Sequence, residues 1–200
     1  MKPIDFWYSI GSTYSYLTVL RLSDYAAEHG VRFNWRPFNV RDIMIEQKNI
    51  PFANKPTKSA YMWRDIERRA SMYNLPISVP APYPLENLAL ANQVAHLGHR
   101  EGWGETYTVE TYRLWFVEGQ LAGSEPNLSE SLRRAGQDPE IVLEKAQSQE
   151  IVEALESETI FCRDLGVFGS PSFVVGDEIF WGDDRLDDAV SWLKNGQVKN

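Results

Sequence analysis

The fold is decided by residues 166–175, which read Gly-Val-Phe-Gly-Ser-Pro-Ser-Phe-Val-Val. The apolar run after Pro171 predicts a strand over 172–175, and a similar run predicts a second strand over 178–181. Only Gly176 and Asp177 separate the two runs, which is the spacing of a β-hairpin turn. A helix is predicted over 184–193, so the chain is expected to end as two antiparallel strands and a helix.

The N-terminal segment predicts a second group of sheet-forming elements. Residues 4–8 form an aromatic-rich run typical of a buried strand, and another strand is expected over 31–37. Between them, apolar residues recur at helical spacing from 19 to 26, with Ser12 as the expected N-cap and Gly30 as the expected end of the helix. A strand, a helix and a strand at this spacing form a βαβ unit, so the two strands are expected to be parallel.

The middle of the chain is predicted to be mainly helical. The polar, weakly patterned stretch 39–56 is expected to be a long loop that shapes a site. Helical spacing then recurs over 57–159, with a break near Ser148. The fold class is therefore α/β, with a helical domain at 57–159 inserted into a domain formed by 1–56 and 160–200.

Composition excludes several functional classes. The chain of 200 residues is 43% hydrophobic but has no apolar run of the roughly 18 residues that a membrane helix needs. Its N-terminus lacks the pattern of a signal peptide, so a cytoplasmic location is expected. A net charge of -8 disfavours binding to nucleic acid and to anionic membranes, and neither is expected as a partner.

The cysteine and histidine content argues against redox and metal centres. Cys162 is the only cysteine, which excludes an intrachain disulfide and a Cys-x-x-Cys centre. Its apolar neighbours favour a buried structural role over a nucleophilic one. His96 and His99 have no third ligand at a diagnostic spacing, so they are interpreted as surface histidines and no metal site is predicted.

Three motifs occur in a consistent order along the chain. Residues 5–8 read Asp-Phe-Trp-Tyr and residues 12–17 read Ser-Thr-Tyr-Ser-Tyr-Leu; the second motif is 166–175, and residues 180–186 read Phe-Trp-Gly-Asp-Asp-Arg-Leu. Together they resemble the branch of the thioredoxin superfamily that contains the 2-hydroxychromene-2-carboxylate isomerases, the kappa-class glutathione transferases and the periplasmic disulfide oxidoreductases. This resemblance spans nearly the whole chain and implies a thioredoxin fold, with N-terminal βαβ and C-terminal ββα halves separated by the helical insertion. Thr13 departs from the proline of that family.

The resemblance implies glutathione as cofactor and gives Ser12 a catalytic role. Ser12 stands where redox relatives carry a cysteine, and its hydroxyl would favour the thiolate form of a bound glutathione by donating a hydrogen bond to the sulfur. The positive end of a following helix would add to this effect. The alternative is that Ser12 only caps that helix.

Residues of the C-terminal half are implied to hold the peptide part of glutathione. In the resembled family the Ser170–Pro171 bond is cis, and it would offer the Ser170 backbone to the cysteinyl unit in the manner of an added strand. The alternative is a trans proline that opens an edge strand. Asp183 and Asp184 would meet the γ-glutamyl ammonium, although both also suit a helix N-terminus.

Two residues ahead of the predicted helical domain complete the expected site. The segment 54–56 reads Asn-Lys-Pro, and the resemblance implies that Asn54 and Lys58 bind the tripeptide from the opposite side, with Lys58 reaching a carboxylate. A lysine beside a helix is also commonly just solvated.

The function implied by the resemblance is a glutathione-dependent isomerase. Its substrate would be 2-hydroxychromene-2-carboxylate or a similar aromatic 2-oxo acid, isomerised through transient addition of the thiolate. Family resemblance also implies a homodimer. Two alternatives remain open, a kappa-type glutathione transferase or peroxidase and a non-catalytic module that binds glutathione or peptides.

Overall fold

The structure is a computed structural model that describes residues 2–52 and 54–199. Its centre is a four-stranded sheet of order β2-β1-β3-β4. β1 (Ile4–Tyr8) runs parallel to β2 (Phe33–Pro37), while β3 (Ser172–Val175) is antiparallel to both β1 and β4 (Glu178–Trp181). The predicted parallel pair and the predicted hairpin are therefore confirmed, although β2 begins later than expected.

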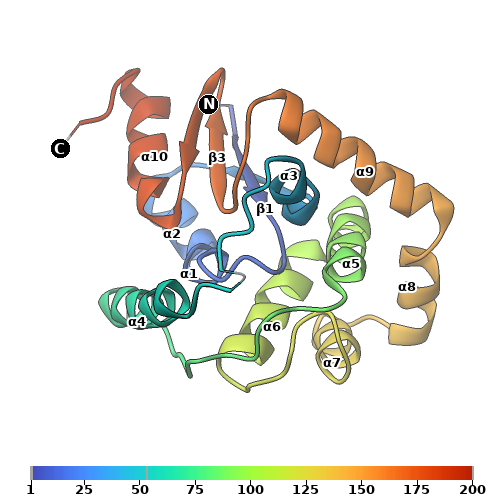
Figure 1. The fold of residues 1–200 in the computed structure, drawn as a ribbon. Helices are drawn as coiled ribbons and strands as arrows, with labels where there is room; N and C mark the ends of the chain where they lie inside the picture. The colour runs from blue at the N-terminus through green and yellow to red at the C-terminus, as the bar shows by residue number, and fades with distance from the viewer. Residues whose placement is uncertain (1, 53, 200) are drawn as a thin grey trace.

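Helices cover both faces of the sheet, as the alternation of side chains in β1 requires. Phe6 and Tyr8 belong to the main hydrophobic core, together with residues of α1 (Ser15–Val19), α2 (Leu22–His29) and α10 (Leu186–Asn195). Trp7 points to the opposite face and packs in a second cluster with residues of α3 (Val40–Glu46) and α9 (Gln149–Asp164). Figure 1 shows α10 and α9 on opposite sides of β3. This is the thioredoxin arrangement that the motifs implied.

The remaining helices lie between the two sheet-forming halves of the sequence. They are α4 (Pro56–Met72), α5 (Leu88–Glu101), α6 (Gly104–Phe116), α7 (Asn127–Arg134) and α8 (Pro139–Ala146). They gather in the lower half of Figure 1. The predicted break near Ser148 is confirmed, since α8 ends at Ala146 and α9 begins at Gln149. α9 runs unbroken through residue 160, where the two proposed domains would meet. Within the described residues, no helix has the length and apolar content needed to cross a bilayer.

Two predictions about the loops beside the sheet are wrong. The stretch 39–56 contains helix α3, because Val40 and Ile43 lie three residues apart and both pack into the cluster around Trp7. The first helix begins at Ser15 with Tyr14 as N-cap, and α1 and α2 replace one continuous helix. Ser12 is therefore not a helix cap.

Gly98 lies inside a helix, because α5 continues past it to Glu101 and has Gly102 as its C-cap. A Cβ at Gly98 would lie 2.7 Å from both the Trp103 ring and the Gly104 Cα. Gly98 thus permits the close approach of α5 and the start of α6, which is a packing role that a helical pattern does not reveal.

Candidate functional site

Ser12 lies in the loop between β1 and α1 and is partly exposed. Its hydroxyl donates a hydrogen bond to the backbone carbonyl oxygen of Ser170, with 2.6 Å between the oxygens. Its backbone N–H donates to the carbonyl oxygen of Ser9 at 3.0 Å. The side chain therefore faces the loop before β3, and residues 158 positions apart in sequence meet here.

The loop before β3 is fixed from beneath by buried serines. The Ser170–Pro171 peptide bond is cis, as the resemblance implied. The Ser170 hydroxyl accepts a hydrogen bond from the Ser9 N–H at 2.8 Å and bonds to the Ser15 hydroxyl at 2.8 Å. Ser15, which is completely buried, thus acts as a structural contact of this loop. The arrangement leaves the Ser170 carbonyl facing the more exposed Ser12.

Two polar side chains of the helical half hold the Ser12 loop, and the sequence analysis did not single out either. Tyr112 on α6 donates to the carbonyl oxygens of Ser9 and Ser12 at 2.9 and 3.1 Å. Asn92 on α5 accepts from the Ile10 N–H at 2.8 Å and donates to the Ile10 carbonyl oxygen at 3.1 Å. Both side chains are fully buried, so these contacts form a fixed joint between the two halves of the molecule.

Asp183 is buried in an ion-pair network. Its carboxylate accepts from the Thr18 hydroxyl and from Arg21 at 3.0 Å each, and from Arg69 on α4 at 2.9 Å. The side chain is only 1% exposed. The structure therefore places Asp183 behind Arg69 rather than free to meet an ammonium group.

Asp184 is the exposed member of the predicted acidic pair. Its side chain is 49% exposed and accepts from Arg185 at 2.8 Å. That hydrogen bond and the Arg185 charge hold the pKa of Asp184 below its ordinary value. Asp184 is accordingly an accessible, ionised carboxylate.

A cavity of about 330 Å³ brings four of the predicted residues together. It lies between α4 and the end of the β3–β4 hairpin. Its lining residues come from the first loop, from α4, from the cis-proline loop and from the start of the last helix; they are Tyr14, Tyr61, Asp65, Arg69, Ser170, Pro171, Trp181, Gly182, Asp183 and Asp184. Ser12 borders this cavity through its hydrogen bond to Ser170.

Asn54 and Lys58 are not among the residues that line this cavity. Both are exposed, and they lie immediately before and within the first turn of α4. The Lys58 ammonium lies 5.5 Å from the centre of the Phe52 ring. The prediction that these two residues share a site with Ser12 therefore stays a prediction.

The cavity carries charges of both signs on α4. Burial alone would lower the pKa of Arg69, but its hydrogen bond to Asp183 and the charge of that carboxylate raise it, so Arg69 is a fixed cation. One helical turn away, Asp65 accepts a hydrogen bond from the Tyr14 hydroxyl at 3.0 Å. Burial, with further contributions from Asp65, raises the pKa of Tyr14, which keeps the phenol protonated. The cavity thus offers one cation and two carboxylates: Asp184 and the less exposed Asp65, which also pairs with Arg68 at 3.3 Å.

A larger depression of about 730 Å³ lies elsewhere, between α7 and α8. Its lining residues include Arg133, Gln137 and Glu140, and it opens widely to solvent. None of its lining residues contacts the Ser12 loop through a hydrogen bond among the described residues. The smaller cavity beside Ser12 is therefore the better candidate for chemistry.

Cys162 and His99, which the sequence also drew attention to, lie packed among other side chains. Cys162 is buried, as predicted, and its burial raises the pKa of the thiol. The interpretation of His99 as a surface residue is wrong, because its ring bonds to the Tyr8 hydroxyl at 2.8 Å and stacks on Trp35. Within the described residues, no group of three side chains is arranged to hold a metal ion.

Comparison with known proteins places this geometry in a family. The profile of the DSBA-like thioredoxin domain matches residues 3–194. The chain is 29% identical to a 2-hydroxychromene-2-carboxylate isomerase of Sphingobium xenophagum, over 96% of this chain and 98% of that protein. It is 27% identical to glutathione S-transferase kappa 1 of Caenorhabditis elegans, over 98% and 93% of the two chains. A solved structure of a 2-hydroxychromene-2-carboxylate isomerase superposes with a TM-score of 0.81 at 26% identity, covering 92% of this chain and 91% of the other. The chain therefore belongs to the DSBA-like thioredoxin domain family.

Proposed function

We propose that the protein is a glutathione-dependent isomerase that acts on 2-hydroxychromene-2-carboxylate or a similar aromatic 2-oxo acid. The observation that carries the proposal is the contact of Ser12 with the Ser170 carbonyl at the edge of a charged cavity. Likeness over nearly full length to proteins named as 2-hydroxychromene-2-carboxylate isomerases supports it.

The cavity residues fit the charges of glutathione. The tripeptide carries two carboxylates, one ammonium group and a thiol. Arg69 is suited to a carboxylate, and Asp65 and Asp184 are suited to the ammonium group. The ammonium group and a carboxylate of glutathione would thus each meet a side chain of opposite charge on α4 or at the start of the last helix. Asp183 would act indirectly, by holding Arg69 in place.

Bound glutathione would supply a thiolate that adds reversibly to a conjugated carbon of the substrate. Ser12 would donate a hydrogen bond from its hydroxyl to the sulfur and so favour the charged form. In the structure the hydroxyl proton is directed to the Ser170 carbonyl, and a rotation about the Ser12 side-chain bond would redirect it. Tyr112, through the Ser12 carbonyl, and Asn92, through the Ile10 backbone, would keep the loop in place during that rotation.

The absence of a second thiol in the sequence separates this site from a dithiol centre. Ser12 and Ser15 stand at the two positions where redox relatives would need cysteines, and Cys162 is buried in the cluster around Trp7. No disulfide exchange within the chain is possible, but the thiolate of another molecule can use the same position.

A kappa-type glutathione transferase or peroxidase is the second candidate, because the chain is also similar to a kappa-class protein over most of its length. The test is to assay the purified protein with 2-hydroxychromene-2-carboxylate, 1-chloro-2,4-dinitrobenzene and cumene hydroperoxide, each with and without glutathione. Isomerisation that requires glutathione supports the proposal. Activity on the other two substrates alone supports the transferase, and no activity on any of them supports a non-catalytic binding module.

A further inference from the structure

Arg41 on α3 forms no ion pair among the described residues, although its charge opposes the rise in the pKa of the neighbouring Asp42. Its guanidinium donates a hydrogen bond to the carbonyl oxygen of Leu85 at 3.0 Å. The neighbouring carboxylate of Asp42 accepts instead from Asn39 at 2.9 Å. Arg41 is partly buried, so its charge is only partly hydrated. A partly buried guanidinium with free donors is suited to bind an external anion.

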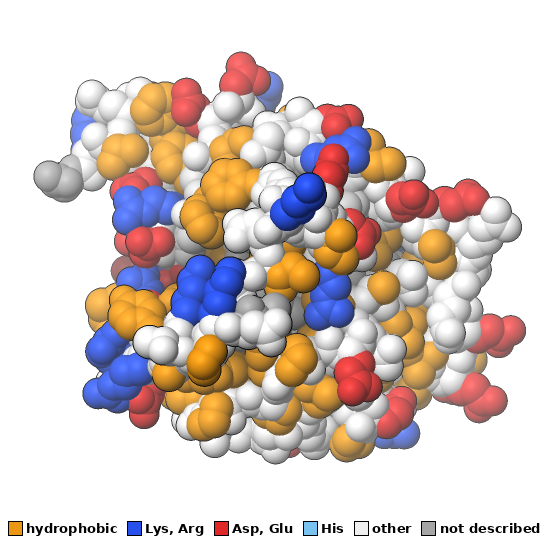
Figure 2. Space-filling view, in the orientation of Figure 1, with side chains coloured by type: hydrophobic (Ala, Val, Ile, Leu, Met, Phe, Trp, Pro, Cys, Tyr) orange, Lys and Arg blue, Asp and Glu red, His pale blue; other side chains and the backbone are white. Residues whose placement is uncertain are grey.

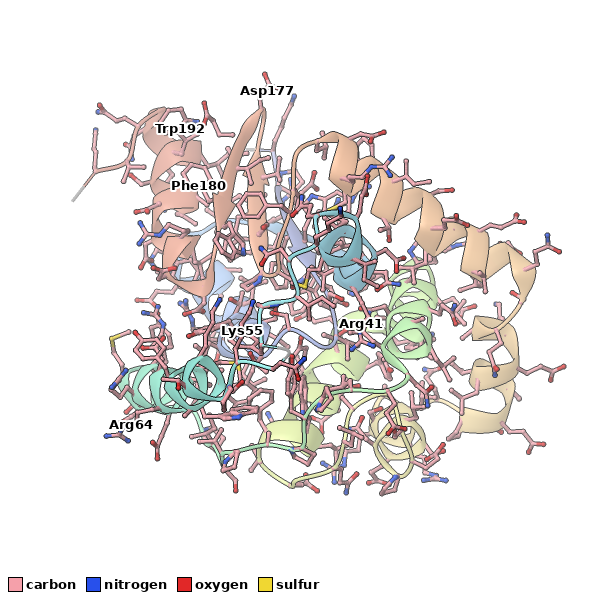
Figure 3. All side chains as sticks on the ribbon, viewed as in Figure 1. Arg41, Lys55, Arg64, Asp177, Phe180 and Trp192 are labelled. Carbon is pink, nitrogen blue, oxygen red and sulfur yellow. The ribbon has the colours of Figure 1, made fainter. Side chains whose placement is uncertain are left out.

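Arg41 lies next to the Ser12 loop through Leu85. A Cβ at Gly11 would stand 3.9 Å from the Leu85 side chain and would overlap Leu88, so the segment that Arg41 holds packs directly on the residue before Ser12. Gly11 has a φ of 126°, which also restricts this position to glycine. Figure 3 shows Arg41 in the middle of the viewed face, between α3 and the helical half. The Arg69 cavity is lined by a different set of residues, among them Ser170 and Pro171, and not by Arg41.

Tyr83, two residues before the Leu85 carbonyl that Arg41 contacts, belongs to a group of aromatic rings. Tyr83 is 39% exposed, and its ring centre lies 6.5 Å from that of Phe52 and 6.1 Å from that of Trp63, both edge-on. Burial raises the pKa of the Tyr83 phenol, and the charge of Arg41 opposes that rise, which agrees with a guanidinium close to the ring. In Figure 2, hydrophobic side chains adjoin Lys and Arg side chains in the middle of this face.

We propose that Arg41 and the aromatic group formed by Phe52, Trp63 and Tyr83 bind a planar aromatic carboxylate. The guanidinium would take the carboxylate through its paired donors, and the exposed Tyr83 ring would cover the aromatic plane. The inference rests on the proposed function, to which it adds the residue that selects the acid group of the substrate. It also separates the two anionic ligands, with glutathione against Arg69 and the substrate against Arg41.

The test uses an unreactive pair of ligands of similar shape, 1-naphthoate and the neutral 1-naphthalenemethanol. Calorimetric titration of the wild-type protein, Arg41→Gln and Arg41→Lys would be compared. A matched control is Arg133→Gln, an exposed arginine on α7 whose pairing with Glu130 is loose at 3.6 Å. We expect Arg41→Gln to weaken naphthoate binding at least about tenfold, Arg41→Lys to weaken it less, and Arg133→Gln to leave it unchanged. Binding of the alcohol should be the same in all four proteins.

Two results would overturn the inference: absence of naphthoate binding by the wild-type protein, or equal losses for acid and alcohol in Arg41→Gln. Circular dichroism and melting temperature identify a misfolded variant. If Arg41→Gln is misfolded, Arg41→Lys is compared with the wild type instead. The isomerase assay separates this inference from the proposed function. An active enzyme whose KM for the aromatic acid is unchanged in Arg41→Gln contradicts only the role of Arg41. Naphthoate binding that depends on Arg41 in a protein without isomerase activity contradicts only the proposed function.

Discussion

The Ser12 hydroxyl and the Ser170 carbonyl oxygen, which belong to the first and last thirds of the chain, form a direct hydrogen bond of 2.6 Å. Because Ser12 neither begins a helix nor accepts a bond from a helical N–H, capping does not explain why a serine stands there. Its hydroxyl is instead placed where a small movement would direct it to a ligand atom lying over the cis-proline loop.

Replacing Ser12 by alanine should affect catalysis more than binding. Most contacts of the tripeptide would be made by Arg69, Asp65 and Asp184, so glutathione affinity should change by no more than severalfold. Loss of the hydroxyl should lower kcat for isomerisation by about tenfold or more, since one stabilising hydrogen bond to the charged sulfur is gone. The ultraviolet thiolate absorbance of bound glutathione should titrate at higher pH. Steady-state kinetics and a pH titration measure both effects.

Ser12→Cys is the complementary variant, because it is expected to form a mixed disulfide with glutathione that blocks isomerisation and is reversed by dithiothreitol. Full activity of Ser12→Ala together with an unchanged thiol titration would remove Ser12 from the mechanism, whatever the fold.

Alanine substitutions at Asp183 and at its neighbour Asp184 should differ sharply in their effect on the free energy of unfolding. Asp183→Ala leaves Arg21 and Arg69 without their shared buried partner and should lower the free energy of unfolding by about 3 kcal/mol or more. Asp184→Ala removes only an exposed ion pair and should cost less than about 1 kcal/mol. Urea denaturation of the two variants provides the measurement. Similar losses of unfolding free energy in both variants would show that the ion pairs of Asp183 stabilise the fold no more than the exposed pair of Asp184.

Acid should destabilise the protein through His99. Burial lowers the pKa of His99 to about 4 in the folded state, against about 6.5 in an unfolded chain. The unfolded state therefore binds more protons between these values, so this contribution to stability is complete above about pH 6.5 and is lost as the pH falls toward 4. Unfolding free energies measured across this range should fall less steeply in His99→Gln than in the wild type.

The control for that experiment is His29→Gln, since His29 lies at the end of α2, where its ring stacks on Tyr25 and bonds to the backbone carbonyl of that residue. Its stability should follow the wild-type pH profile. A wild-type slope in His99→Gln would mean that carboxylates alone account for the acid sensitivity.

Cys162 should be unreactive in the native protein. Its thiol is buried and its pKa is raised, so the thiolate that reacts with disulfides is scarce. Ellman's reagent is expected to label it only after unfolding in denaturant, and the protein should not reduce insulin. Rapid labelling of the native protein, or insulin reduction that disappears in Cys162→Ser, would restore a redox role to this residue.

The sheet could be predicted from sequence because its signals are local. Turn residues at Gly176 and Asp177 and apolar runs on either side mark the β3–β4 hairpin, and β1 and β2 follow the same logic. Helix α3 was missed because it has only seven residues, of which Val40 and Ile43 are buried, so no helical stripe of the usual length develops in the sequence. The cap at Ser12 was wrong because the hydroxyl found a tertiary partner, Ser170, that no local rule can anticipate.

Only part of the candidate site could be predicted, because local motifs identify some of its residues and tertiary packing supplies the others. Motifs gave Ser12, Ser170, Pro171 and the acidic pair, which all lie at or beside one cavity. Arg69 and Asp65 look like an exposed helical face in sequence, and only the packing of α4 beside the start of the last helix turns them toward the cavity. The difference in burial between Asp183 and Asp184 likewise comes from tertiary contacts, because Arg21 and Arg69 both pair with Asp183.

Calorimetric titration with glutathione, supported by thermal melting, tests the central claim most directly. We predict that the wild-type protein binds glutathione and that saturating ligand raises its melting temperature, because a ligand selective for the folded state stabilises it. Arg69→Gln should weaken binding at least about tenfold, whereas Arg133→Gln, at a remote exposed arginine, should bind like the wild type. No heat and no thermal shift at millimolar glutathione would contradict the account, since neither the cofactor nor the role of Ser12 would then stand.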